Sequence, residues 1–259
     1  MKTVVCVKQV PDTETRIRIA EGGCALIETD INWIVSPYDE FAIEEALRIK
    51  EKHGGEVVLV GLGPDRVPQA LRTGLAMGAD SAVHLKDPAF ESADPLVISR
   101  ALAAAIRKLG GVDLVLTGQQ GVGDDNSQVP GMLAELLDWP QVTMAVKLEL
   151  AEGQASVERE VEGGHETWRT TLPCVISAQK GLNEPRYASL KGIMGAKKKP
   201  ITVQDAAAVG LDAAALAPQT KLLALELPPA RPGVKMIDGD PATQAGELLR
   251  LPHEEAKVL

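Results

Sequence analysis

The sequence predicts an α/β fold in which helices cover both faces of a doubly wound parallel sheet, and three features predict it. Short apolar runs alternate with amphipathic helical stretches over the first half of the chain, which is typical of βαβ units with right-handed crossovers. The runs contain few polar residues, as expected of strands buried on both faces. Within residues 113–137 (DLVLTGQQGVGDDNSQVPGMLAELL), one run leads into a glycine-rich loop and then a helix. The other elements are organised around this strand, loop and helix.

The order of the strands predicts where a ligand would bind. In the order 3-2-1-4-5, the direction of winding reverses between the first and fourth strands, and doubly wound sheets bind ligands there, beyond the carboxyl ends of the strands. Those ends are Cys6–Lys8 and Thr117-Gly118, so the glycine-rich loop falls where a nucleotide should bind. The five expected strands are Thr3–Lys8, Glu56–Leu62, Ser81–Leu85, Asp113–Thr117 and Val175–Ala178.

Capping signals mark the helices between these strands. Ser36 is expected to cap the first helix, with Pro37 in its first turn and Asp39 in position for a capping box. Gly54-Gly55 then ends that helix. The remaining expected elements are helices from Pro64 to about Met77 and from Asp94-Pro95 to Leu109, and a small hairpin that joins Arg16–Ile19 to Ala25–Ile27.

The glycine-rich loop has two interpretations at this point. Its glycines allow a tight turn and close approach to a ligand. Asn126 or Ser127 can cap the next helix, with Pro130 in its first turn, and that helix start would attract an anion such as phosphate. However, the spacing is neither GxGxxG nor GxxxxGK[ST], and Asp124 and Asp125 add negative charge. From the loop alone, an ordinary strand-to-helix turn is as good an interpretation as a nucleotide site.

After residue 137 the pattern changes. Val142–Leu150, Ala155–Glu162 and His165–Thr171 alternate as antiparallel strands, with Gly163-Gly164 suited to a hairpin turn. The sequence therefore predicts one α/β domain over residues 1–203, with an antiparallel hairpin excursion. Residues 204–259 have apolar stretches but no pattern of a second core, which indicates an extended arm that packs on another chain.

Composition excludes several classes of protein. Aromatic residues make up only 3% of the chain and the net charge is −9, which disfavours nucleic-acid binding. No apolar run is long enough to span a bilayer. The three cysteines have no CxxC spacing and the four histidines no metal-ligand spacing, so we expect reduced thiols, a cytoplasmic protein and no metal site.

The segment around residues 182–199 (LNEPRYASLKGIMGAKKK) is basic on an otherwise acidic chain. From Lys180 to Lys199 there are six basic residues and one acid, with Leu190, Ile193 and Met194 between the charges. The segment is either a short solvated helix with a lysine end or a docking segment whose apolar anchor and charges meet an acidic partner. Physical reasoning from the sequence does not favour either interpretation of the segment over the other.

The chain resembles a known family, the β subunits of electron transfer flavoproteins. The resemblance runs through VCVKQVPD (5–12), SPYDEFAIEEALRIKEK (36–52), ALRTGLAMGAD (70–80), DWPQ (138–141) and the segment at 182–199. It implies an adenine-nucleotide-α-hydrolase-like fold and a heterodimer with an α subunit that holds most of the redox-active FAD. In the β subunit it implies a buried, structural AMP.

Carried over block by block, the resemblance places AMP in the predicted crevice and Tyr38 near the flavin of the α subunit. The cofactor-binding positions that it implies are Cys6, Ser36, Pro37, Tyr38, Asp39, Leu62, Gly118, Gln119, Gln120, Gly121, Val122, Gly123, Asp124, Asp125, Asn126, Ser127 and Gln128.

The resemblance also implies a recognition loop at residues 182–199, with Leu190 as the apolar anchor that inserts into a dehydrogenase. The partner-docking positions are Arg186, Tyr187, Leu190, Ile193, Met194 and Lys197. The family's β subunits are electron carriers and not enzymes. They serve fatty acid oxidation by accepting electrons from acyl-CoA or related dehydrogenases and passing them to a membrane quinone oxidoreductase.

Two alternatives stay open at this point. The loop reads GDDNSQVPG, unlike the GDxTAQVGP of electron-bifurcating relatives, whose β subunit binds a second FAD and which oxidise NADH; the loop therefore favours the AMP type. An ATP-using enzyme of the same fold would need an SGGxDS-type loop after the first strand. Lys8–Asp12 contains neither glycine nor serine.

Overall fold

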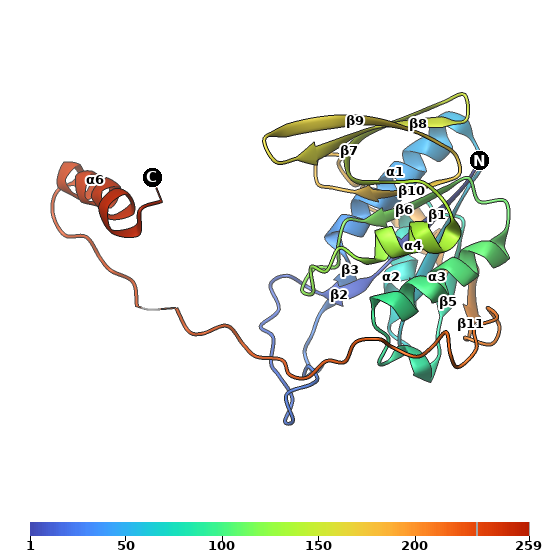
Figure 1. Ribbon diagram of the computed structural model, residues 1–259, viewed down its shortest axis with the longest axis horizontal. Coiled ribbons are helices and arrows are strands. Elements are labelled where there is room, and N and C mark those ends of the chain that lie inside the picture. The colour runs from blue at the N-terminus through green and yellow to red at the C-terminus, as the bar shows by residue number, and fades with distance from the viewer. Residues whose placement is uncertain (232, 259) are drawn as a thin grey trace. The chain divides into compact units, whose positions relative to one another are not determined.

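The computed structural model describes residues 1–231 and 233–258 (Figure 1) and divides into two compact units. The larger unit comprises residues 1–18 and 26–223. The smaller comprises residues 19–25 and the chain from Ala224 onwards.

The larger unit is built on a nine-stranded sheet with the order β11-β5-β4-β1-β6-β10-β7-β8-β9. The five predicted strands correspond to β1, β4, β5, β6 and β10, and their predicted order is confirmed. All pairs from β11 to β7 are parallel, whereas β7, β8 and β9 pair antiparallel. The strands are β1 (Lys2–Val7), β4 (Glu56–Leu62), β5 (Ser81–Leu85), β6 (Leu114–Gly118), β7 (Gln141–Ala151), β8 (Gln154–Val161), β9 (Gly164–Thr171), β10 (Cys174–Ala178) and β11 (Ile201–Gln204).

Helices cover both faces of the parallel sheet, as predicted. Side chains alternate between the faces: Val5 and Leu59 join one buried cluster with α1 and α2, and Val4 and Val60 join a second with α3 and α4. This two-sided burial explains why the strand sequences are almost wholly apolar. The helices are α1 (Pro37–His53), α2 (Val67–Met77), α3 (Pro95–Leu109), α4 (Val129–Leu137) and α5 (Leu190–Ala196), with a 3-10 turn at Pro88–Phe90.

Neither of the two predicted side-chain caps forms, although Asp94, at the predicted start of α3, does cap its helix. Asp94 caps α3 by accepting a hydrogen bond from the Val97 N–H at 2.9 Å. Ser36 precedes α1 but makes no side-chain cap bond, and its hydroxyl oxygen is buried without a partner. At α4 the cap residue is Gln128, because the Ser127 hydroxyl bonds to the Gln120 side chain at 2.9 Å instead.

The predicted hairpin before α1 does not form regular strands. Two backbone hydrogen bonds cross this turn, from the Ile27 N–H to the Arg18 carbonyl at 2.9 Å and from the Ala20 N–H to the Ala25 carbonyl at 2.8 Å. The ordered pair in this region is β2 (Gln9–Pro11) with β3 (Trp33–Val35), antiparallel. Ile17 and Ile19 are only partly buried, so pairing of this segment as a regular strand would be weakly stabilised.

The smaller unit has little buried surface. Its helix α6 (Pro241–Arg250) is capped by Asp240, which accepts from the Thr243 N–H at 2.9 Å, and continues into a π-helical turn at Leu251–Ala256. No residue of α6 is buried, and Leu248 and Leu249 are exposed. Among the described residues of the whole chain, no helix has both the length and the apolar character needed to cross a bilayer.

Candidate functional site

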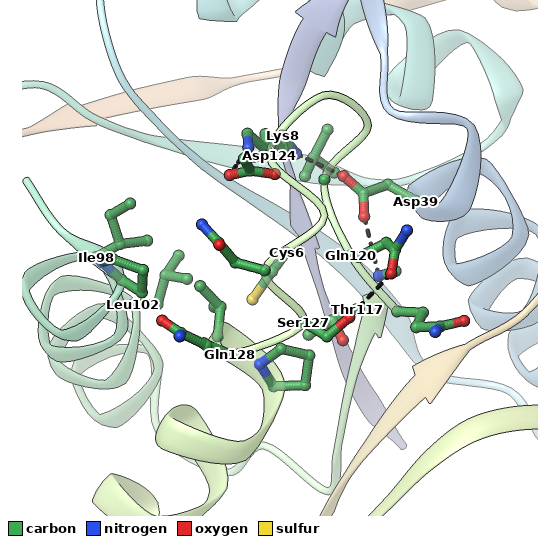
Figure 2. Close-up of a pocket in the computed structure, with 18 of the residues that line it drawn as sticks. Cys6, Lys8, Asp39, Ile98, Leu102, Thr117, Gln120, Asp124, Ser127 and Gln128 are labelled. Atoms are coloured by element: carbon green, nitrogen blue, oxygen red, sulfur yellow. Dashed lines mark hydrogen bonds and ion pairs between the residues drawn. The ribbon is translucent and has the colours of Figure 1, made fainter. Parts of the chain in front are cut away.

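A cavity of about 180 Å³ opens at the carboxyl ends of β1 and β6, at the predicted reversal point of the sheet (Figure 2). Its floor is formed by Cys6 and Thr117, and the loop after β6 runs along its rim. Ile98 and Leu102 enter from α3, and Val129 and Pro130 from the start of α4. The lining comes from six helices and strands, β1, β4, β6, α1, α3 and α4, together with the loop after β6.

One wall of the cavity is apolar. It is formed by Val60, Leu62, Pro95, Ile98, Leu102, Val129 and Pro130. An apolar cavity of roughly 150 Å³ is enough to hold a benzene ring. The cavity can therefore accommodate a flat heteroaromatic ring against this wall, while the rest of a ligand extends toward the loop.

The opposite wall is polar and includes side chains without partners inside the protein. The Thr117 hydroxyl oxygen and the Gln119 side-chain oxygen are buried and make no hydrogen bond. Buried polar atoms are nearly always paired in folded proteins. Both residues line the cavity, so these two atoms are suited to a polar ligand group.

Asp39 joins the ends of β1 and β6. One carboxylate oxygen accepts from the Lys8 N–H at 2.6 Å and the other from the Gly118 N–H at 2.9 Å. Burial raises the pKa of Asp39 to about 7, although both hydrogen bonds and the nearby Lys8 charge act to lower it. The predicted capping-box role is thus wrong, because the strand ends use this carboxyl group as their acceptor.

An ion pair crosses the rim of the cavity. Lys8 Nζ lies 2.7 Å from Asp124 Oδ2, linking the end of β1 to the loop (Figure 2). A Cβ added at Gly121 would overlap with the Lys8 side chain and lie 2.8 Å from Asp124. A larger residue at position 121 would therefore displace the ends of the Lys8 and Asp124 side chains, the ion pair that we call the rim clasp.

Eleven of the seventeen predicted cofactor-binding residues line the cavity: Cys6, Asp39, Leu62, Gly118, Gln119, Gln120, Gly121, Asp124, Asn126, Ser127 and Gln128. The other six, Ser36, Pro37, Tyr38, Val122, Gly123 and Asp125, are their sequence neighbours but do not line it. Lys8 and Thr117 were predicted as strand ends beside the crevice but were not among the implied binding positions, and the residues from α3 were not predicted to lie at the site. The signal for Lys8 was its position directly after the first apolar strand, at the strand end where a doubly wound sheet binds its ligand.

Cys6 is not poised for nucleophilic chemistry, because burial, followed by the charge of Asp39, raises the pKa of its thiol. Within the described part of the chain, no group of three His, Cys, Asp or Glu side chains is placed to hold a metal ion.

The predicted docking segment lies apart from the cavity, over α2. Tyr187 is 99% exposed, Leu190 76%, Met194 66% and Ile193 47%, and Lys197 is also exposed. α5 contacts α2 closely, since a Cβ at Gly192 would overlap with the Ala76 carbonyl. The apolar side chains thus form an outward-facing patch, whereas the Arg186 side chain bonds to α1.

The chain is similar to known proteins along nearly all of its length. A family model described as "Electron transfer flavoprotein domain" matches residues 23–209. The chain is 42% identical to the electron transfer flavoprotein subunit beta of Bacillus subtilis over 260 residues, which cover 100% of both chains. It is 41% identical to the Homo sapiens subunit beta over 240 residues, 91% of this chain and 92% of the human one. It is also 39% identical to the caffeyl-CoA reductase-Etf complex subunit CarD of Acetobacterium woodii over 254 residues, 96% and 97% of the two chains.

Proposed function

Because the chain belongs to the family of electron transfer flavoprotein β subunits, we propose that it carries electrons as half of a heterodimer. It pairs with an α subunit that holds most of the FAD, and FAD supplies the redox chemistry. The complex accepts electrons from acyl-CoA or related dehydrogenases and passes them to a membrane quinone oxidoreductase. The exposed apolar patch on α5 is the observation that carries this proposal, because a carrier must dock on several partners in turn.

The cavity is proposed to hold a structural AMP. The apolar wall suits the adenine ring, and the unpartnered oxygens of Thr117 and Gln119 suit a ligand with donor groups. Asn126, Ser127 and Gln128 border the cavity beside the start of α4, where a phosphate is favoured by the helix dipole. These residues fit a nucleoside monophosphate.

Two features favour AMP over a second FAD. Both residues of the rim clasp, Lys8 and Asp124, line the cavity, and we infer that a dinucleotide, being larger than a mononucleotide, would have to displace them. Lys8 is the only cation among the described residues that line the cavity, and Asp124 already neutralises it, so a second phosphate would meet no free positive charge.

The relative from the caffeyl-CoA reductase-Etf complex supports a second candidate. In that alternative, the β subunit binds a second FAD in the same cavity and the complex oxidises NADH. The rim clasp would then have to open.

An ATP-using enzyme is the weaker alternative. In such enzymes the turn after the first strand would offer backbone N–H groups to the phosphates. Here the Lys8 N–H is bonded to Asp39, and Lys8–Asp12 lacks the glycines and serines that such a turn needs.

The smaller unit is proposed to be an arm that packs on the α subunit. Its apolar side chains are exposed, among them Leu227, Val234, Met236 and Leu248. Exposed apolar residues of this number mark an interaction surface. A chain ending at Leu223 should therefore fail to copurify with the α subunit, whereas copurification of the shortened chain would refute the proposal.

Leu190→Ala tests the docking function. The heterodimer should keep its FAD, but the KM for the flavoprotein in its reduction by a purified acyl-CoA dehydrogenase should rise about tenfold, the effect of losing one buried apolar anchor. Val203→Ala is the matched control, since Val203 is also exposed (59%) but lies on β11. An unchanged KM for Leu190→Ala would refute docking through α5.

A further inference from the structure

We propose that Arg186 is a positioning residue: it fixes the docking segment to α1 through a carboxylate clamp formed by Glu44 and Glu51, and it does not itself contact the partner dehydrogenase. This inference rests on the proposed docking function, which it deepens by separating the residues that meet the partner from those that hold them in place.

The guanidinium of Arg186 is almost fully occupied within the chain. Nε donates to Glu44 Oε2 at 2.7 Å and Nη2 to Glu44 Oε1 at 3.0 Å. Nη1 donates to Glu51 Oε1 at 2.5 Å and Nη2 to Glu51 Oε2 at 3.2 Å. A guanidinium has five N–H donors, so these four bonds leave one for any partner.

The clamp is bidentate on both carboxylates, which restricts direction as well as distance. The backbone N–H of Arg186 also donates to Glu44 Oε2, at 3.2 Å. Glu44 thus holds both the side chain and the main chain of residue 186, one step before the exposed Tyr187.

The contact also stabilises α1, where Glu44 is paired with both Arg186 and Arg48. The Glu44 side chain is only 3% exposed, and an unpaired buried carboxylate is costly. Burial acts to raise its pKa, but hydrogen bonds from Arg186 and Arg48 outweigh burial and hold the pKa below its usual value. The pKa of Glu51 is also lowered, chiefly by its bond to Arg186.

The segment that the clamp holds has no regular structure of its own. Residues 183–189 form neither helix nor strand, so side-chain contacts alone fix their path. Asn183 provides a second attachment, donating to the Phe41 carbonyl and to Glu45 Oε2, both at 3.0 Å. All these contacts lie on α1.

The far end of the docking segment is attached separately, to α2. Arg72 donates to the carbonyls of Ala196 and Lys199, and Lys199 Nζ donates to the Leu75 carbonyl at 2.9 Å. Loss of the Arg186 clamp should therefore free residues 183–189 and the start of α5, including Leu190, while the end of α5 stays in place.

The test combines backbone exchange with kinetics on the complete heterodimer. Hydrogen–deuterium exchange followed by mass spectrometry reports order in residues 182–190, without any partner. Steady-state reduction by a purified acyl-CoA dehydrogenase gives KM and kcat for the flavoprotein. The variants are Arg186→Gln, Arg186→Lys and Glu51→Gln; Glu51 lies on α1 outside the docking segment, and its side chain is 59% exposed, so its replacement should leave the fold intact.

For Arg186→Gln we expect exchange in 182–190 to be about tenfold faster, since local opening loses its main restraint, and KM to rise about tenfold with kcat nearly unchanged. Glu51→Gln should shift both quantities in the same direction by about twofold, because Glu44 still holds Arg186. For Arg186→Lys, the exchange rate and KM should both lie between those of the parent and of Arg186→Gln, because lysine keeps the charge but not the bidentate geometry.

A higher KM for Arg186→Gln with unchanged exchange, and no effect of Glu51→Gln, would overturn the proposal in favour of direct partner contact. Faster exchange with an unchanged KM would also overturn it, provided that Leu190→Ala raises KM. If Leu190→Ala leaves KM unchanged too, the docking function itself fails, and the exchange data alone show whether the clamp orders the segment.

Discussion

Replacing Asp39 with Asn should change how the stability of the protein depends on pH. The Asp39 carboxyl group is buried and its pKa is raised from 3.8 to about 7. A carboxyl group whose pKa is higher in the folded chain binds its proton more tightly there, so its contribution to stability is greatest below about pH 4 and falls as the pH rises to about 7.

The size of the effect follows from the two pKa values. Between pH 5 and pH 8, ionisation of Asp39 should lower the free energy of unfolding by about 2–3 kcal/mol, at 1.36 kcal/mol per pKa unit. Asparagine has no charge, but its NH₂ group cannot accept a bond, so the N–H of Lys8 or Gly118 loses its acceptor. That loss costs about 1–3 kcal/mol and does not depend on pH.

The assay is chemical denaturation of the nucleotide-free protein and of Asp39→Asn at pH 5, 6, 7 and 8, followed by tryptophan fluorescence. The variant should be clearly less stable than the parent at pH 5, and the difference should shrink or reverse by pH 8. A difference that stays constant from pH 5 to pH 8 would refute a raised pKa for Asp39 and with it the account of how the two strand ends are joined.

Three further predictions concern the loop and the docking segment. Gly121→Ala should push Lys8 away and open the rim clasp, so purified protein should contain less AMP, with affinity about tenfold weaker by calorimetry; unchanged affinity would contradict the clasp's role. Gly192→Ala should force α5 away from the Ala76 carbonyl and lower the free energy of unfolding, measured by chemical denaturation, by about 1–3 kcal/mol. An unchanged free energy of unfolding would mean that α5 packs loosely on α2. Because the pKa of Glu51 is lowered in the folded chain, its contribution is present near neutral pH and lost in acid, so a protease should cleave residues 182–190 faster at about pH 3 than at about pH 6. Equal cleavage rates at these two pH values would argue against the clamp.

The strands could be predicted from the sequence because burial on both faces of the sheet requires them to be apolar, and their order followed from the doubly wound fold class. The runs at β1, β4, β5, β6 and β10 are apolar at nearly every position, and the helices between them show a single apolar stripe. The conformation of the glycine-rich loop could not be predicted from a sequence pattern in the same way. Ser127 looked like a helix cap, but its hydroxyl is used by Gln120 within the loop, and no periodic pattern encodes that choice.

The cavity was predictable where it is formed by the glycine-rich loop and by the strand ends at Cys6 and Leu62, but not on the side formed by α3. Ile98 and Leu102 belong to the apolar stripe of α3, and from sequence such residues look like any others that face the core. Arg186 posed the opposite problem. It lies in a basic segment, which suggested that it contacts a partner protein. The carboxylates that bind it belong to Glu44 and Glu51 of α1, and in the sequence these two residues look like part of a solvent-exposed helix face.

The proposal that this β subunit contains structural AMP is tested most directly by the nucleotide content of the complex. The chain would be coexpressed with its α subunit, and the purified heterodimer denatured and its nucleotides quantified by chromatography. We predict one FAD and one AMP per heterodimer, with the AMP lost in a variant that fills the cavity, such as Leu102→Trp. Two FAD and no AMP would contradict the account and make the cavity a second flavin site.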